Sequence, residues 1–216
     1  MCAEMDADYS IELGADAPAL ELPWVDPEGR LEYIDLRSES AGIEHIVERI
    51  PEAREFPALR TFLIDVNSQH SAWQTAKCDV WAEVVEATEN LYGAKFAQNC
   101  YLDLVLTAQW TSLRESLELH EKLARQLARS LDGDDSLQAT AEIVVRRCYF
   151  HREFGSKEFS GTERPMDTSD EGYCLTLYLS GFGTSVEAAA ADWERAMRLA
   201  AGCLLHLQPQ EERAKG

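Results

Sequence analysis

Three leucines occupy every second position in the stretch Asn99-Cys100-Tyr101-Leu102-Asp103-Leu104-Val105-Leu106-Thr107. A β-strand directs alternate side chains to opposite faces, so this stretch predicts a strand with a leucine face. The same alternation returns in residues 173–180, where the leucines are Leu175, Leu177 and Leu179. The two stretches therefore predict matching strands whose leucine faces lie against one hydrophobic core.

Each of these strands belongs to a predicted strand–strand–helix unit. The first unit consists of a strand at 76–85, a strand at 99–107 and a helix at 112–131. The second consists of a strand at 140–154, a strand at 173–180 and a helix at 185–207. Both helices show an apolar stripe at helical spacing, and each begins with a capping-box pattern, Ser112-x-x-Glu115 and Thr184-x-x-Glu187.

The predicted fold class is α+β. Duplicated ββα units, repeat 1 at about 75–131 and repeat 2 at about 138–207, form one antiparallel sheet with two long helices on one face. They make up a main domain at 71–216, and an acidic N-terminal accessory segment at 1–70 packs on it. Residues 1–55 hold 15 acidic and 4 basic side chains, and five of the seven prolines lie at or before Pro57.

The accessory segment shows patterns of its own. Residues 19–24 and 31–36 alternate as strands do, and the turn chemistry of 26–29 between them predicts a β-hairpin. Apolar residues at helical spacing predict a helix at 43–50. Pro57 opens a second predicted helix at 57–67, although residues 61–66 also fit a short buried strand.

Composition excludes several classes of function. The chain has 216 residues with 39 acidic and 20 basic side chains, a net charge of −19. With no basic stripe, nucleic acid and anionic membrane surfaces are not expected partners. No apolar run of membrane-spanning length occurs, and the first residues do not resemble a secretory signal, so we expect a soluble cytoplasmic protein.

The six cysteines contain no C-x-x-C pair, which leaves no zinc-site signature. Four of them fall one in each predicted strand and are interpreted as small buried hydrophobic side chains. No metal motif, nucleophile elbow or phosphate-binding loop occurs, and no cofactor is indicated.

Period-2 geometry predicts a second, polar and aromatic sheet face behind the leucines. This face carries aromatic rings beside carboxylates, a combination that suits a cleft for a polar or cationic ligand. Its candidate ligand-binding residues are Asp79, Trp81, Glu83, Tyr101, Asp103, Tyr149, His151, Glu153, Thr176 and Tyr178. The alternative is that the acidic N-terminal segment folds over this face. The long connection at 155–172 is either a lid or disordered.

His151 and Glu153 alternate along one predicted strand and leave it on the same face. Such a pair can act as a base with its orienting carboxylate, or as two metal ligands with a third from Asp79, Glu83 or Asp103. Three functions stay open: a non-catalytic domain that binds a small molecule or a protein, a hydrolase or isomerase centred on His151 and Glu153, and an assembly protein that forms a homodimer through the sheet face.

Overall fold

The structure is a computed structural model that describes residues 5–24, 26, 28–29, 32–37, 42–86, 92–132, 137–151 and 169–209. Over these residues the chain is α+β, with a mixed six-stranded sheet, five α-helices and one 3-10 helix. The strands are β1 (Asp6–Glu12), β2 (Leu20–Leu22), β3 (Trp73–Val84), β4 (Phe96–Leu106), β5 (Ala139–His151) and β6 (Ser169–Gly183). The helices are α1 (Ile43–Val47), α2 (Pro51–Glu55), α3 (Pro57–Val66), η1 (Ala108–Leu113), α4 (Leu117–Leu131) and α5 (Val186–His206).

The four strands predicted within residues 71–216 are antiparallel to one another, but the whole sheet is mixed, because it also includes strands of the N-terminal segment. Its strand order is β1-β5-β6-β4-β3, and β2 also pairs with β5. The pairs β5–β6, β6–β4 and β4–β3 are antiparallel, whereas β1 and β2 both run parallel to β5. The N-terminal segment therefore supplies the edge of the main sheet, which sequence alternation within residues 71–216 does not reveal.

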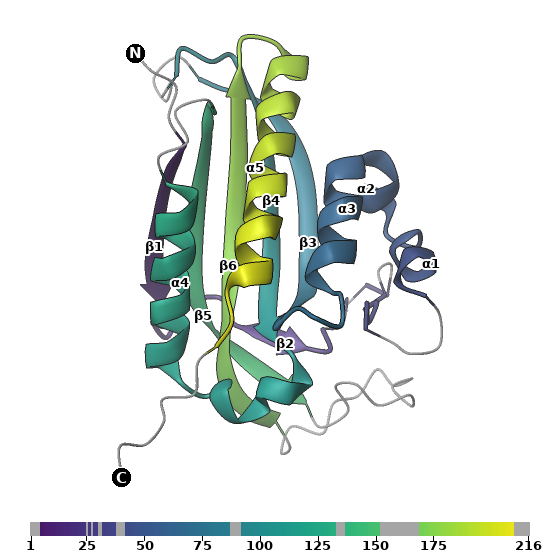
Figure 1. The fold of residues 1–216 in the computed structure, drawn as a ribbon, viewed down its shortest axis with the longest axis vertical. Helices are drawn as coiled ribbons and strands as arrows, with labels where there is room; N and C mark the ends of the chain where they lie inside the picture. Colours follow the sequence, from purple (N-terminus) through teal and green to yellow (C-terminus); the bar gives the residue numbers. More distant parts are fainter. Residues whose placement is uncertain are drawn as a thin grey trace.

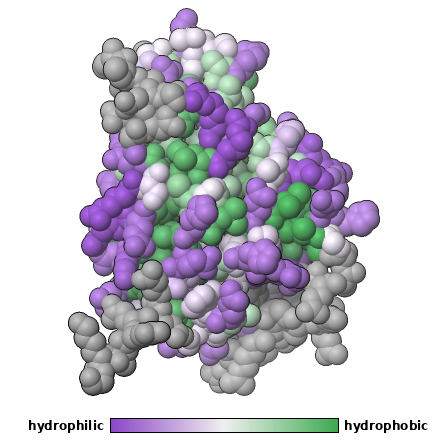
Figure 2. All heavy atoms as spheres, viewed as in Figure 1, coloured by the Kyte–Doolittle hydropathy of each residue, from purple (hydrophilic) through white to green (hydrophobic). Residues whose placement is uncertain are grey.

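One face of the sheet carries the helices and the main core. α5 packs on β6 and β4, α4 packs on β5 and β1, and α3 packs on β3 and α5 (Figure 1). The alternating leucines of β4 and β6 are fully buried against Trp193 and Met197 of α5. Figure 2 shows this side, with hydrophobic side chains in the furrows between largely hydrophilic helix surfaces.

The order strand–strand–helix occurs twice between β3 and α5. The two helices do not occupy equivalent places, because α5 lies on β6 and β4 while α4 lies largely on β5 and β1. That the two units are duplicates stays a prediction.

The predicted start of the second long helix at 185 is confirmed, whereas the first long helix begins later than predicted, and both predicted capping residues are displaced. The cap of α4 is Ser116, whose hydroxyl accepts from the Leu119 amide at 3.2 Å, and the preceding residues form η1. The cap of α5 is Ser185, which accepts from the Ala188 amide at 3.2 Å. The predicted capping boxes are wrong because a serine nearer each apolar stripe satisfies the free N–H groups.

The predicted hairpin of the N-terminal segment is also wrong. Residues 20–22 pair with β5, and the described residues 32–37 contain no strand. The turn itself forms, since the Gly29 amide donates to the Asp26 carbonyl at 3.0 Å and Gly29 has a φ of 64°. The helix beginning at Pro57 is confirmed as α3, which rules out a strand at 61–66.

β6 begins at Ser169, so the last residues of the predicted connection at 155–172 belong to this strand. The rest of that connection, residues 155–168, lies outside the described residues. The segment predicted to be either a lid or disordered thus lies almost entirely outside the described part of the chain.

Candidate functional site

The strand registers bring most of the predicted site residues onto the sheet face opposite the helices. Asp79 pairs with Tyr101 across β3 and β4, and Tyr101 pairs with Tyr178 across β4 and β6. Asp103 pairs with Thr176, and by alternation Trp81 and Glu83 lie on the same face. We call the surface formed by these seven residues the open face: Asp79, Trp81, Glu83, Tyr101, Asp103, Thr176 and Tyr178.

An aromatic row crosses three strands of the open face. The ring centroids of Trp81 and Tyr101 are 6.5 Å apart, and those of Tyr101 and Tyr178 are 6.2 Å apart, both pairs tilted by 51°. Trp81 is 39% exposed, which is unusual for so large an apolar ring, and both tyrosines are half-buried. Burial, together with the Asp103 and Asp79 carboxylates, raises the pKa of Tyr101, so its phenol stays neutral at physiological pH.

Asp103 is the most buried acid of the open face, at 7% exposure. Its Oδ1 accepts a hydrogen bond from the Thr176 hydroxyl at 2.6 Å. Burial raises the pKa of Asp103, against the opposing effects of Thr176, Arg146 and Lys77. Burial therefore disfavours the ionised form of Asp103, and the hydrogen bond from Thr176 and the two nearby cations offset only part of this effect.

The other two acids of the open face are exposed on β3. The Glu83 carboxylate accepts from Asn99 Nδ2 at 2.9 Å, and Asp79 Oδ1 accepts from the Val80 amide at 2.8 Å. Asp79 and Glu83 lie on either side of Trp81 along the strand, so the exposed ring lies between two negative charges.

Two cations that sequence reasoning missed lie among these groups. The Lys77 ammonium lies 5.9 Å from the Tyr101 ring and 6.0 Å from the Trp24 ring. The Arg146 guanidinium lies 5.5 Å from the Tyr178 ring and pairs with Glu12 at 3.2 Å. Lys77 could have been predicted, because it lies two residues before Asp79 and alternation places both on the same face of the strand.

Arg146 was missed because the register of β5 was predicted one residue out. Ile143, Val144 and Val145 form a continuous apolar run, since β5 is buried on both faces here, and such a run gives no alternation to follow. The prediction placed Tyr149, His151 and Glu153 on the open face. The structure places Arg146 there instead, by its pairing opposite Cys174.

Tyr149 and His151 consequently face the opposite side from Tyr101 and Tyr178, and their assignment to the open face is corrected. His151 Nε2 lies 3.5 Å from the Glu21 carboxylate of β2. Glu153 lies outside the described residues. His151 thus lies across the sheet from Asp79, Glu83 and Asp103, which cannot complete a site with it, and the described residues contain no cluster of three metal-ligating side chains.

A second, smaller core covers the lower end of the same sheet face. β2, Trp24 and Tyr33 pack there on Ala76, Val105, Cys148, Phe150 and Cys174. The Trp24 indole donates to the Ala76 carbonyl at 3.0 Å. The N-terminal segment therefore covers part of the predicted face and leaves the end with Trp81 exposed.

A shallow groove of about 290 Å³ lies elsewhere, between β1 and α4. Its lining includes Tyr9, Arg125 and Arg129, with Asp8 and Asp132 beside them. Arg125 Nε donates to the Tyr9 hydroxyl at 3.0 Å, so this arginine already has a partner within the chain. The groove carries both acidic and basic side chains, so its charge does not indicate a class of ligand.

None of the described helices is long and apolar enough to cross a bilayer. No family model matches the chain, and neither a curated protein nor a solved structure matches it. Function must therefore be argued from the open face itself.

Proposed function

We propose that this chain is a non-catalytic binding module whose open face holds a positively charged partner. The observation that carries the proposal is the aromatic row ending in the exposed Trp81, with Asp79 and Glu83 on either side of it. Cations are attracted to the faces of aromatic rings, and adjacent carboxylates add Coulomb attraction.

The chain's own cations support this chemistry. Lys77 lies over Tyr101 and Arg146 lies over Tyr178, so two rings of the row already accept a cation from within the molecule. Among the described residues no cation lies over Trp81. We infer that Trp81, at the end of the row, is the place for a cation from outside.

Charge argues for a different partner rather than a second copy on this face. By strand register this side of the sheet carries seven acidic side chains, six of them exposed and one, Asp103, buried, against the two cations. The carboxylates are those of Asp6, Asp8, Glu12, Asp79, Glu83, Asp103 and Glu142. Two such faces brought together repel each other, whereas a basic surface is attracted. An enzyme centred on His151 gains no support, because His151 pairs with Glu21 on the other face.

The test uses a defined cationic probe, an acetylated and amidated Lys-Val-Lys-Val-Lys-Val peptide, and its Glu-Val counterpart. Calorimetric titration of the full chain should detect the lysine peptide only, with affinity that falls as salt rises. Trp81→Ala removes an exposed ring and should weaken binding about fivefold, equivalent to about 1 kcal/mol. Val186→Ala is the matched control, since Val186 is 49% exposed on α5.

Amide NMR gives the location of binding. Shift changes should gather at Trp81, Tyr101 and Tyr178. Equal binding of both peptides, no binding at millimolar concentration, or an equal effect of Trp81→Ala and Val186→Ala would overturn the proposal.

A further inference from the structure

The outer edge of the sheet at β3 is closed along one half and open along the other. In the lower half, side chains from outside the sheet occupy the edge groups. Arg37 donates to the Trp73 carbonyl at 2.9 Å, Trp24 donates to the Ala76 carbonyl at 3.0 Å, and the Thr75 amide donates to Asn67 at 3.0 Å. Such hydrogen bonds prevent another strand from pairing there.

The upper half of β3 differs. The Val85 amide donates to the Lys95 carbonyl at 3.0 Å, so Val85 and every second residue before it bond toward β4. The residues between them direct their N–H and C=O groups away from the sheet. Asp79 satisfies one of these groups, the Val80 amide. No described residue bonds the outward groups of Ala82 and Val84.

Exposure agrees with an open edge. All four residues from Trp81 to Val84 are exposed, and Val84 is 73% exposed, the highest value among the large hydrophobic side chains of the described chain. An exposed strand end of this kind is a template for another strand.

We propose that the partner docks as an added β-strand along the outer edge of Cys78–Val84, with basic side chains on the open face. This inference rests on the proposed function and names the form of its partner. The pairing supplies backbone hydrogen bonds from Ala82 and Val84. Lysine or arginine side chains at alternate positions of the partner then lie beside Asp79, Trp81 and Glu83, and its other positions carry small apolar side chains against Val84.

A second copy fits this edge less well. If two β3 edges pair antiparallel with Trp81 opposite Trp81, Asp79 of each copy lies directly opposite Glu83 of the other. Like charges opposite each other across a strand pair are destabilising. A partner strand with lysines opposite Asp79 and Glu83 instead forms two attractive charge pairs.

The test adds two analogues of the Lys-Val peptide, one N-methylated at its valine amides and one at its lysine amides. With lysines on the open face, antiparallel pairing turns the valine amides toward β3. Valine methylation should therefore weaken calorimetric binding at least tenfold, and lysine methylation should leave it unchanged. Ala82→Pro removes an outward N–H and should also cost about tenfold, while Ala82→Val keeps the N–H and serves as its control.

The outcomes separate the two proposals. If both methylated peptides and Ala82→Pro bind like their parents while Trp81→Ala weakens binding, the face binds cations but strand addition is wrong. If lysine methylation alone blocks binding, the strand pairs in parallel and the edge proposal holds. If no Lys-Val peptide binds, both proposals fail. Sedimentation that shows a dimer lost on Ala82→Pro assigns the edge to a second copy and overturns the proposed partner.

Discussion

Gly181 is the point where α5 rests directly on the sheet, and Gly181→Ala tests that contact. A Cβ at this position would lie 2.2 Å from the Trp193 nitrogen, 2.5 Å from the Ala189 carbonyl oxygen and 2.7 Å from the Trp193 Cα. All three atoms are backbone, so no side-chain rotation relieves the overlap. The helix must retreat by about 1 Å from the strand to restore an ordinary contact.

That retreat loosens the best-packed part of the core, since Trp193 and Met197 are at most 1% exposed. Overpacking costs about 1–3 kcal/mol, and a backbone clash belongs at the upper end of that range or above it. For a chain of this length, a loss of about 3 kcal/mol lowers Tm by roughly 6–12 °C.

Gly202→Ala is the matched control on the same helix. A Cβ at Gly202 meets nothing within 4 Å, so alanine gains helix propensity worth up to about 1 kcal/mol and should raise Tm slightly. Urea unfolding followed by circular dichroism measures both variants. A Gly181→Ala protein within about 1 kcal/mol of its parent would refute the seating of α5 on β6 described above.

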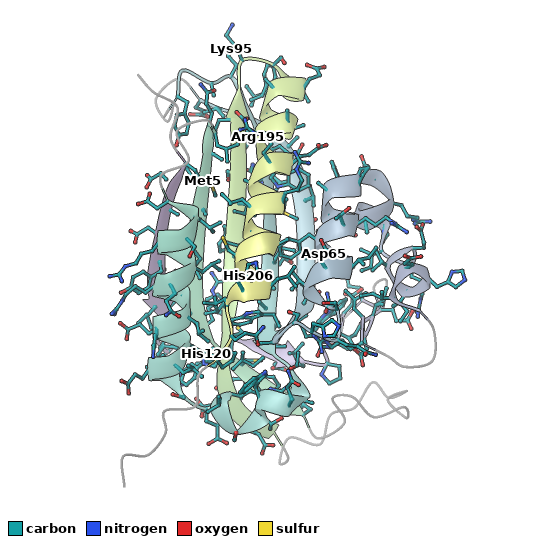
Figure 3. The ribbon with its side chains drawn as sticks, in the orientation of Figure 1. Met5, Asp65, Lys95, His120, Arg195 and His206 are labelled. Atoms are coloured by element: carbon teal, nitrogen blue, oxygen red, sulfur yellow. The ribbon has the colours of Figure 1, made fainter. Side chains whose placement is uncertain are left out.

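Three further changes test His120, Asp103 and Arg37. His120 lies near the start of α4 (Figure 3). Burial lowers its pKa to about 4 from an ordinary 6.5, so its contribution to stability is complete above pH 6.5 and falls by roughly 3 kcal/mol toward pH 4. His120→Gln should flatten this dependence in urea midpoints, and an unchanged slope contradicts it. Burial raises the pKa of Asp103, so the stability contributed by its protonated form is lost as pH rises through that pKa. The Tm of Asp103→Asn should therefore rise relative to that of its parent between pH 4 and 8. A Tm difference that stays constant over this range contradicts the prediction. Arg37 donates to three backbone carbonyls, and Arg37→Met should cost about 2–3 kcal/mol in chemical unfolding. Arg49 forms an exposed ion pair with Glu32, so Arg49→Met should lower the free energy of unfolding by less than about 0.5 kcal/mol. Equal losses in Arg37→Met and Arg49→Met would contradict the stabilising role given to the Arg37 hydrogen bonds.

Alternation and helical spacing were sufficient wherever one face of an element is apolar and the other is largely polar. The strands around Leu104 and Leu177 and the helix at Pro57 were predicted for that reason. The same period placed Tyr101 and Tyr178 on the polar face, but their pairing depends on the strand order, which the sequence did not give.

The rest depended on contacts between distant segments. β1 alternates polar and apolar side chains along its seven residues, but this pattern was missed, and its parallel pairing with β5 could not be derived from the sequence. The lower end of β5 is apolar also on the open face, where β2 covers it. The sequence therefore could not show which of the two adjacent arginines of β5 lies beside Tyr178. His151 was assigned to the wrong face through the same one-residue error.

The parallel pairing of β1 with β5 has a consequence for synthesis on the ribosome. Glu12 meets Arg146 across 134 residues of chain, so the first strand has no partner until most of the protein has been made. At about 5–20 residues per second the wait lasts roughly 7–27 s. During that time Asp6, Asp8 and Glu12 keep the unpaired strand charged and hydrated, which opposes premature association with neighbouring chains.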